Sequence, residues 1–471
     1  MTPSVTSPPS PATREALTSF DILGVIFEAC LALDFSVEWQ SDVWQKMALG
    51  AVCRCWRLVL ESLPALWSHI ILVPRMPQYY IDKVFRLAKA APKRLSIELL
   101  RDSELDTTFL SSVAALLVAK AESVTHLSVH YYSYFAWNTF IDYISAVNSQ
   151  PNLSSLQRLS ATLNQPDTEL SHPFPGLTPS LEHLHLDGLN PSSFMIGPNI
   201  VTLVLMRWDL VDNPIDSFVF AATLLDCLDQ VTNLETLVID INEPLIAHSI
   251  HLVVLPHLNN LTFVCHTSSP HACGTLISQI RVPQAQALTL CLTSLRNMQH
   301  FLSMNETLIS CVTSLRLVGH ISAYIEYTGG QAKLLSSLMG TKLHSLNLFD
   351  VTGLFGYNRQ RRVFVQTQFL EIIAHTLAIP TVLHLVVPPL LSPPYPDLHP
   401  TLIRSLFEPA SIPGRTQHVV EEHALCLDSG SYHSKCSRRW SWDHHGLHWT
   451  KEASTLPPPD YVSFPESIWF D

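Results

Sequence analysis

A short leucine-rich unit recurs through most of the chain beyond residue 90 and constrains its fold more than any other feature. In a clear copy, apolar residues occupy the first, fourth and sixth positions, as in Leu181-Glu-His-Leu184-His-Leu186. Clear copies centre on Leu184, Leu237, Leu261, Leu315 and Leu346, and weaker copies centre on Leu95, Leu127, Leu159, Leu203, Leu288 and Leu383. The alternation within each copy predicts a short strand with one buried face. Because one such strand cannot bury that face alone, we expect the copies to stack on one another.

Successive copies lie roughly 20 to 35 residues apart, close to the period of leucine-rich repeats. Helix-like stretches at 109–119 and 369–377 lie between some of them. The sequence therefore resembles the leucine-rich-repeat family in an irregular form. The resemblance implies an α/β stack, with short strands joined by helices or loops on the convex side. Asn164 and Asn242 match the family's asparagine position, but most copies do not, which favours irregular curvature. The alternative is a conventional α/β domain whose leucine-rich strands imitate the repeat.

Two amphipathic stretches lie near the N-terminus. The first is predicted to begin a helix at Asp21, and its apolar stripe comprises Ile22, Leu23, Ile26, Phe27, Cys30 and Leu31. The second is predicted to be one helix over 48–63, and its stripe comprises Val52, Trp56, Val59, Leu60 and Leu63. Helices in about fifty residues bury little surface alone, so we expect them to need a partner or a docked neighbouring domain.

The two stretches together resemble the F-box, over residues 17–71. The matching patterns are Asp21-Ile-Leu-x-x-Ile-Phe27, Val52-Cys-x-x-Trp-Arg57 and Pro64-x-Leu-Trp67. Ser19-Phe20 replaces the Leu-Pro pair with which the family usually opens, and residues 34–44 separate the two halves. The resemblance implies a three-helix module that docks on the linker protein Skp1 of a cullin-based ubiquitin ligase. The implied docking residues are Ile22, Leu23, Ile26, Phe27, Val52, Cys53, Trp56, Pro64, Leu66 and Trp67. The alternative is that Trp56, Leu66 and Trp67 form the core of a small helical cap.

These resemblances divide the chain into four expected parts. They are a disordered leader rich in Ser, Pro and Thr at 1–16, the F-box at 17–71, irregular leucine-rich repeats at 72–390 and a tail rich in Pro, His and Trp at 391–471. An F-box followed by such repeats implies a non-catalytic substrate adaptor of an SCF-type (Skp1, cullin, F-box) ubiquitin ligase. The adaptor would hold a client protein near the loaded ubiquitin-conjugating enzyme and so raise its effective concentration. The alternative is a leucine-rich interaction scaffold without ligase association.

Stacked repeats present the residues between their core leucines on a concave face, which solenoids use as an extended binding surface. We expect the client to contact residues that flank the core positions, together with an Arg-Trp pair of types enriched in binding hot spots. These candidates are His126, Arg158, His183, His185, Asp187, Arg207, Trp208 and Arg316. The alternative for each of them is an ordinary solvated position.

Composition excludes several functions. The formal net charge is −12, and no basic patch is visible, which argues against a nucleic-acid partner. No apolar signal segment or uninterrupted membrane span occurs, so we expect a cytoplasmic or nuclear protein without a membrane partner. The ten cysteines include no Cys-x-x-Cys pair and are expected to be reduced thiols. Common catalytic motifs are absent from the sequence, so we expect neither an enzyme nor a cofactor.

The last eighty or so residues are dense in Cys, His and Trp. Cys426, Cys436, His444 and His448 could be drawn as a zinc site, because zinc prefers such ligands. Their spacing fits no zinc finger, however, and the ligands are not paired. We therefore predict no metal and a compositional tail that packs its tryptophans on the last repeat.

Overall fold

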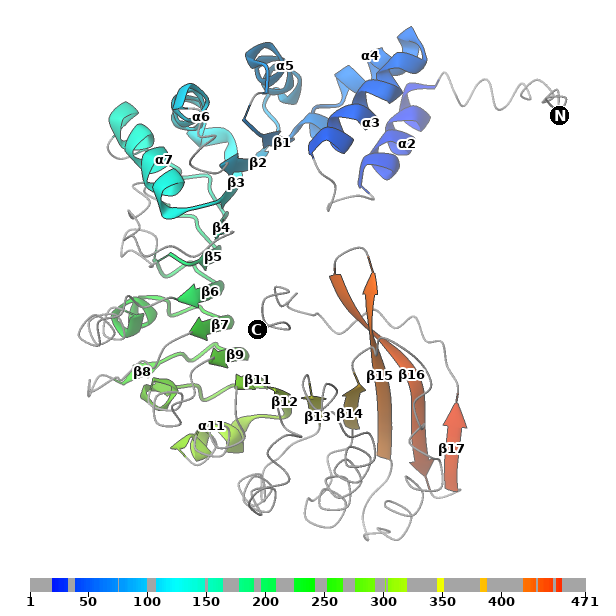
Figure 1. Cartoon of the computed structure of the whole chain (residues 1–471), viewed down its shortest axis with the longest axis vertical. Coiled ribbons are helices and arrows are strands. Elements are labelled where there is room, and N and C mark those ends of the chain that lie inside the picture. The colour runs from blue at the N-terminus through cyan, green and yellow to red at the C-terminus, as the bar shows by residue number, and fades with distance from the viewer. Residues whose placement is uncertain are drawn as a thin grey trace, which may run out of the picture. The chain divides into compact units, whose positions relative to one another are not determined.

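The computed structural model describes seventeen segments of the chain, and all structural statements below concern them. They are 19–32, 39–74, 76–99, 107–148, 151–163, 178–189, 196–208, 224–241, 252–265, 276–292, 301, 304–319, 345–350, 382–387, 418–428, 431–443 and 446–450. The chain divides into two compact units, Met1–Asn199 and Ile200–Asp471. Figure 1 shows the helices and strands of both.

Three α-helices and one 3-10 turn open the first unit. They are α2 (Phe20–Ala32), α3 (Trp39–Val52), α4 (Arg54–Ser62) and η1 (Pro64–Trp67). Helix α2 begins one residue before the predicted start at Asp21, and the Leu23 backbone N–H bonds to the Ser19 carbonyl at 3.0 Å. Leu23 and Phe27 of α2, Val59 and Leu60 of α4 and Trp67 of η1 are buried. These side chains supply the apolar core of the N-terminal helices.

The prediction of one helix over 48–63 is wrong, because the chain breaks at Cys53. Cys53 is extended, with φ −160° and ψ 172°, and it caps α4 by accepting the Trp56 backbone N–H on its sulfur at 3.4 Å. This N-cap satisfies a backbone donor that the first turn of α4 cannot satisfy within the helix. Val52 consequently ends α3 and is 59% exposed instead of lying on the buried stripe.

The first unit also holds a parallel sheet in the order β1-β2-β3-β4-β5. Its strands are β1 (His69–Leu72), β2 (Lys93–Leu99), β3 (Val124–Tyr131), β4 (Arg158–Leu163) and β5 (His183–Asp187). Between them lie α5 (Gln78–Ala88), α6 (Thr107–Ala119), η3 (Ala121–Ser123) and α7 (Tyr134–Val147). Figure 1 shows α5, α6 and α7 on one side of these strands. Their apolar faces bury residues such as Phe85, Leu110 and Phe140.

The second unit continues the same alternation of strand and connection. Its parallel strands are β6 (Thr202–Trp208), β7 (Thr236–Ile241), β9 (Asn260–Cys265), β11 (Ala287–Leu292), β12 (Ser314–Gly319), β13 (Ser345–Asp350) and β14 (Val382–Val387), each paired with the next. Shorter elements between them are helical residues 224–230, β8 (Val253–Val254), η4 (Ile277–Gln279), β10 (Ile280–Arg281) and α11 (Glu306–Cys311). Strands β8 and β10 form a separate parallel pair.

Every repeat centre predicted from the sequence lies on a strand, and within each unit the centres lie in register. In the first unit, Leu95, Leu127, Leu159 and Leu184 occupy one line across β2–β5. In the second unit the line runs through Leu203, Leu237, Leu261, Leu288, Leu315, Leu346 and Leu383. The predicted α/β fold with helices at the N-terminus and leucine-rich-repeat-like strands is therefore confirmed.

The structure adds elements that the sequence did not predict. Ile70 of β1 pairs with Leu95, so the line of core residues starts one strand earlier. The expected tail contains β15 (His418–Asp428), β16 (Ser431–Asp443) and β17 (Gly446–Thr450). Strand β15 pairs in parallel with β14, and the last three strands pair antiparallel in chain order. The predicted helix at 109–119 falls within α6, whereas 369–377, Asn164 and Asn242 lie outside the described residues.

The described cysteines differ in oxidation state. Cys53, Cys55, Cys227 and Cys311 are free thiols, in line with the sequence. Cys265 at the end of β9 is disulfide-bonded, so the expectation of reduced thiols is wrong at that position. Burial raises the pKa of Cys227 to about 11, with the nearby Asp226 carboxylate adding to the effect. Cys227 is therefore an unreactive core thiol at neutral pH.

Among the described helices, none is both long and apolar enough to cross a membrane.

Gly24, inside α2, offers a stabilising substitution. A Cβ added there would meet Leu63 Cδ1 at 3.6 Å, an ordinary van der Waals separation. Since glycine inside a helix costs about 0.5–1 kcal/mol relative to alanine, Gly24→Ala is expected to raise the free energy of unfolding by that amount. Urea unfolding of the full chain, followed by circular dichroism, measures the change. A loss of stability would show that α2 and Leu63 pack more tightly than this separation indicates.

Candidate functional site

The ten residues implied to dock on Skp1 separate into three groups. Leu23, Phe27 and Trp67 are buried within the N-terminal helices. Ile22, Val52 and Cys53 are exposed, while Ile26, Trp56, Pro64 and Leu66 are half-buried. A buried side chain cannot contact a partner directly, so the first group supports the module and the other two can meet another protein.

Trp56 joins the first helix to the third. Its ring lies edge-on to Phe27, with centroids 5.2 Å apart and an interplanar angle of 67°. Edge-to-face aromatic pairs favour this geometry and add to the stabilisation from buried area. Trp56 therefore holds α4 against α2 while part of its surface stays accessible.

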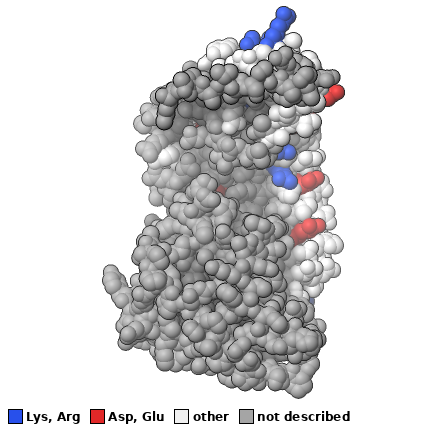
Figure 2. Space-filling view, turned by 90° about the vertical axis from the view of Figure 1, so that its right-hand side faces the viewer, with Lys and Arg blue, Asp and Glu red and all other residues white. Residues whose placement is uncertain are grey.

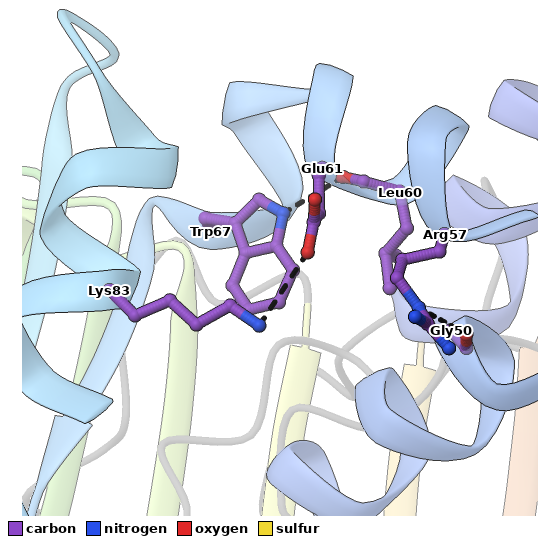
Figure 3. A network of polar contacts seen from close by, with 6 residues as sticks. All are labelled: Gly50, Arg57, Leu60, Glu61, Trp67 and Lys83. Atoms are coloured by element: carbon purple, nitrogen blue, oxygen red, sulfur yellow. Dashed lines mark hydrogen bonds and ion pairs between the residues drawn. The ribbon is translucent and has the colours of Figure 1, made fainter. Parts of the chain in front are cut away.

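Trp67 attaches η1 to the N-terminal helices. Its indole Nε1–H donates to the Leu60 carbonyl at 2.8 Å, and the ring is only 4% exposed. The Lys46 ammonium lies 5.6 Å from the ring centroid, within cation–π range. Figure 3 shows Trp67 beside Leu60 and Glu61 of α4. Trp67 thus secures η1 to α4, a structural role that sequence analysis could not separate from docking.

Polar contacts tie the surrounding helices together. Arg57 Nε donates to the Gly50 carbonyl at 3.0 Å, which joins α4 to α3 across the break at Cys53. Lys83 of α5 pairs with Glu61 at 3.5 Å (Figure 3). A cavity of about 260 Å³ lies among these side chains and is also lined by Trp67. Both ions of the Lys83–Glu61 pair are partly solvated, so the pair contributes little stability.

Exposed apolar side chains gather on the N-terminal helices, and several were missed by the sequence analysis. Ile22 and Val25 are 45% and 67% exposed and lie on the side of α2 opposite the buried Leu23 and Phe27. Further exposed residues are Phe20 of α2, Met47 and Val52 of α3 and Leu58 of α4. Val25 could have been found from helical periodicity, because it falls outside the buried stripe. Several large exposed apolar side chains on one small module are typical of a protein-binding surface.

The second candidate surface is the polar face of β1–β5. Inward and outward residues alternate along each strand, so one position per strand forms a row across the sheet. We call one such row the basic row; its members are His69, Arg94, His126, Arg158 and His183, which pair in register from β1 to β5. Arg94 and Arg158 are exposed, and the three histidines are half-buried. The sequence predicted His126, Arg158 and His183 but missed His69 and Arg94.

The next row along the strands carries hydroxyl groups. Ser96, Ser128 and Ser160 pair in register and lead to His185 of β5, a predicted client-binding residue. Ser160 Oγ lies 3.3 Å from His185 Nδ1, which links β4 to β5. Ser128 Oγ lies 3.2 Å from His130 Nε2 on the same strand. These hydroxyls lie beside the basic row on the same face of the sheet.

Two histidines of the basic row, His126 and His183, have pKa values below that of an ordinary histidine. Burial, together with the guanidiniums of Arg94 and Arg158, lowers the pKa of His126 below its ordinary value. Burial and Arg158 likewise lower the pKa of His183, against a smaller opposing effect of Glu182. Arg94 and Arg158 flank His126 in register on β2 and β4. The positive charge of the row at neutral pH therefore comes from its arginines.

The remaining client-binding candidates differ in burial and in whether the structure describes their side chains. Asp187 is only 3% exposed, so the prediction that it faces the client is wrong. The alternation ends at this position, and Tyr131 Oη–H donates to the Asp187 carbonyl at 2.6 Å. Arg207 and Trp208 lie on β6 and Arg316 lies on β12, but their side chains are outside the described part of the structure. Figure 2 shows charged residues scattered over the described surface of one face, with both signs interspersed.

No metal site emerges from the part of the chain that the structure describes. Within it, no three His, Cys, Asp or Glu side chains gather to hold an ion. Cys426, Cys436 and His448 lie on β15, β16 and β17, and His444 falls outside the described residues. In the antiparallel pairing of β15 with β16, the backbone of Cys426 lies opposite that of His433, and the backbone of Cys436 lies opposite that of His423.

Comparison with known proteins yields only distant structural similarity. No family model matches the chain, and no curated protein matches it. A chain of the crystal structure of the Rad7 and Elc1 complex in yeast aligns with 80% of this chain and 90% of that chain, at 11% sequence identity and a TM-score of 0.27. A similarity at this level identifies no family. The fold described above rests on the strand pairing of this chain, and the F-box resemblance rests on its N-terminal residues.

Proposed function

We propose that the chain is a non-catalytic substrate adaptor of an SCF-type ubiquitin ligase. In this proposal the N-terminal helices dock on Skp1, and the strand-rich remainder holds a client protein. The adaptor does no bond chemistry itself, because it acts by raising the effective concentration of the client near the ubiquitin-conjugating enzyme. We further propose that it works in the cytoplasm or nucleus, where such ligases act.

The apolar surface of the N-terminal helices carries this proposal. Ile22 and Val25 expose apolar area to solvent, and Trp56 and Leu66 are half-buried. Burying such side chains against a partner releases about 25 cal/mol per Å² of apolar area. The F-box resemblance supplies the identity of the partner, and the exposed groups supply the driving force for association.

Co-purification with Skp1 tests the proposal. The full chain, co-expressed with tagged Skp1, is expected to elute with it as a stoichiometric complex in size-exclusion chromatography. An established F-box protein, expressed in parallel, serves as the positive control. If the control retains Skp1 and this chain does not, the chain is a leucine-rich scaffold without ligase association.

A further inference from the structure

The two arginines of the basic row face solvent without local neutralisation. Within the described part of the chain, neither Arg94 nor Arg158 forms an ion pair with a carboxylate. On the polar face of β1–β5, Glu98 of β2 lies four residues from Arg94, and Glu182 directly precedes β5. Arg94 on β2 and Arg158 on β4 flank His126 and are like charges about 10 Å apart, so they repel each other weakly. A bound anion would relieve that repulsion. The row is basic although the chain as a whole is acidic, with a net charge of −12.

The dimensions of the row fit an extended peptide. Neighbouring strands lie about 4.8 Å apart, so five in-register positions span about 19 Å and Arg94 and Arg158 lie about 10 Å apart. An extended segment of about six residues covers the same span. Guanidinium groups bind carboxylates through paired hydrogen bonds, and Ser96, Ser128 and Ser160 lie in the adjacent row to bond a peptide backbone.

We infer that the basic row binds an extended, carboxylate-rich segment of the client protein, which crosses strands β1 to β5 with its acidic side chains against Arg94 and Arg158. The inference rests on the proposed function only in taking the ligand to be a client. It assigns that client a chemical class, an acidic peptide segment, and it extends the predicted surface to His69 and Arg94.

An acidic peptide fits the row better than a nucleic acid does. Proteins that track a phosphate backbone commonly neutralise six to ten phosphates with Lys and Arg, whereas this row offers two permanent cations. Binding of single strands also relies on exposed aromatic rings for base stacking. The members of the basic row and its serine neighbours include no aromatic side chain other than imidazole.

Fluorescence anisotropy with defined peptides tests the inference on the full chain. The probe is a fluorescein-labelled peptide of about eight residues in which Glu alternates with Ser, long enough to cover the row. The matched control peptide carries Gln in place of Glu. We expect the Glu peptide to bind at least about tenfold more tightly than the Gln peptide, because charge-assisted hydrogen bonds exceed neutral ones in strength. Its affinity should fall as salt is raised.

Paired variants locate the binding. Arg94→Gln with Arg158→Gln is expected to weaken binding of the Glu peptide about tenfold or more. Arg86→Gln with Arg281→Gln removes the same number of exposed charges elsewhere and should change binding less than about twofold. Reversing the charge with Arg94→Glu and Arg158→Glu should transfer the preference to a peptide with Lys in place of Glu.

Lowering the pH provides a separate readout. As the pH falls from 7.5 to 5.5, protonation of His126 and His183 sets in at a lower pH than for an ordinary histidine, because burial lowers the pKa of both. The Glu carboxylates of the peptide stay ionised in this range. In the free protein burial opposes protonation of both histidines most strongly. Arg94 and Arg158 add to this at His126, and Arg158 adds to it at His183, where Glu182 favours protonation. The Glu peptide should therefore bind more tightly at the lower pH, and His126→Gln with His183→Gln should reduce that gain.

Three outcomes overturn the inference. They are equal binding of the Glu and Gln peptides, equal effects of the two arginine pairs, and tighter binding of a single-stranded oligonucleotide of similar length than of the Glu peptide. None of these depends on Skp1. A chain that binds the acidic peptide but not Skp1 refutes the proposed ligase role and leaves the acidic-peptide site standing, and the reverse result refutes the site alone.

Discussion

Replacing Trp67 with alanine is expected to lower the free energy of unfolding by about 3–5 kcal/mol, as truncation of buried aromatic side chains does. The indole is almost fully enclosed, and it donates a hydrogen bond to the Leu60 carbonyl. Lys46 would also lose the ring under its ammonium group. Denaturant unfolding of the full chain, with the N-terminal helices followed by hydrogen exchange, measures the effect.

Trp67→Phe separates packing from hydrogen bonding. Phenylalanine retains most of the buried ring but cannot donate to the Leu60 carbonyl, so a loss of about 1–2 kcal/mol is expected. Lys83→Gln serves as the control, since it removes a partly solvated ion pair with Glu61 and should cost less than about 1 kcal/mol. A Trp67→Ala protein as stable as the wild type would show that Trp67 is available for docking instead of forming the core.

Ile22→Asp combined with Val25→Asp is expected to weaken Skp1 binding on the order of a hundredfold, because each exposed apolar residue at an interface centre can contribute about 1–2 kcal/mol or more. Both side chains are largely solvent-exposed in the free chain, so the double variant should fold normally. Surface plasmon resonance with immobilised Skp1 measures the affinity, and thermal unfolding checks the fold.

A matched control tests whether the position matters. Phe135→Asp with Val147→Asp makes the same change at two exposed apolar positions of α7, away from the F-box-like helices. This control should bind Skp1 as the wild type does. Equal losses in both double variants would attribute the effect to general surface charge, and no loss in either would place the linker contact elsewhere on the chain.

The strands were predictable because their signal is local and repeated. In copies such as Leu184-His-Leu186, two apolar residues flank a polar one, and the leucine-centred pattern recurs in strand after strand along the chain. The centres Leu127, Leu159 and Leu184 consequently lie in register although their spacings differ. Connections of different lengths are tolerated because each joins the end of one strand to the start of the next and adds no residue to the line of core leucines.

The break at Cys53 was not predictable from periodicity. Val52, Trp56 and Val59 have the spacing of one continuous helix, and no glycine or proline marks a boundary between Val52 and Arg54. The break depends on capping by a cysteine sulfur and on the Arg57 contact to the Gly50 carbonyl, which joins residues across it. Weak caps of this kind compete closely with helix continuation, so tertiary contacts select the outcome.

For this chain, the sequence by itself determined the class of fold and the line of leucines that holds the strands together, because apolar periodicity decides which face is buried. Only the tertiary structure decided which members of the F-box-like motif are core and which are surface, since burial depends on neighbouring helices. Likewise, Arg94 joined His126 and Arg158 only through strand pairing. His126 lies about thirty positions from each arginine in the sequence, and the sheet places it one strand away from both.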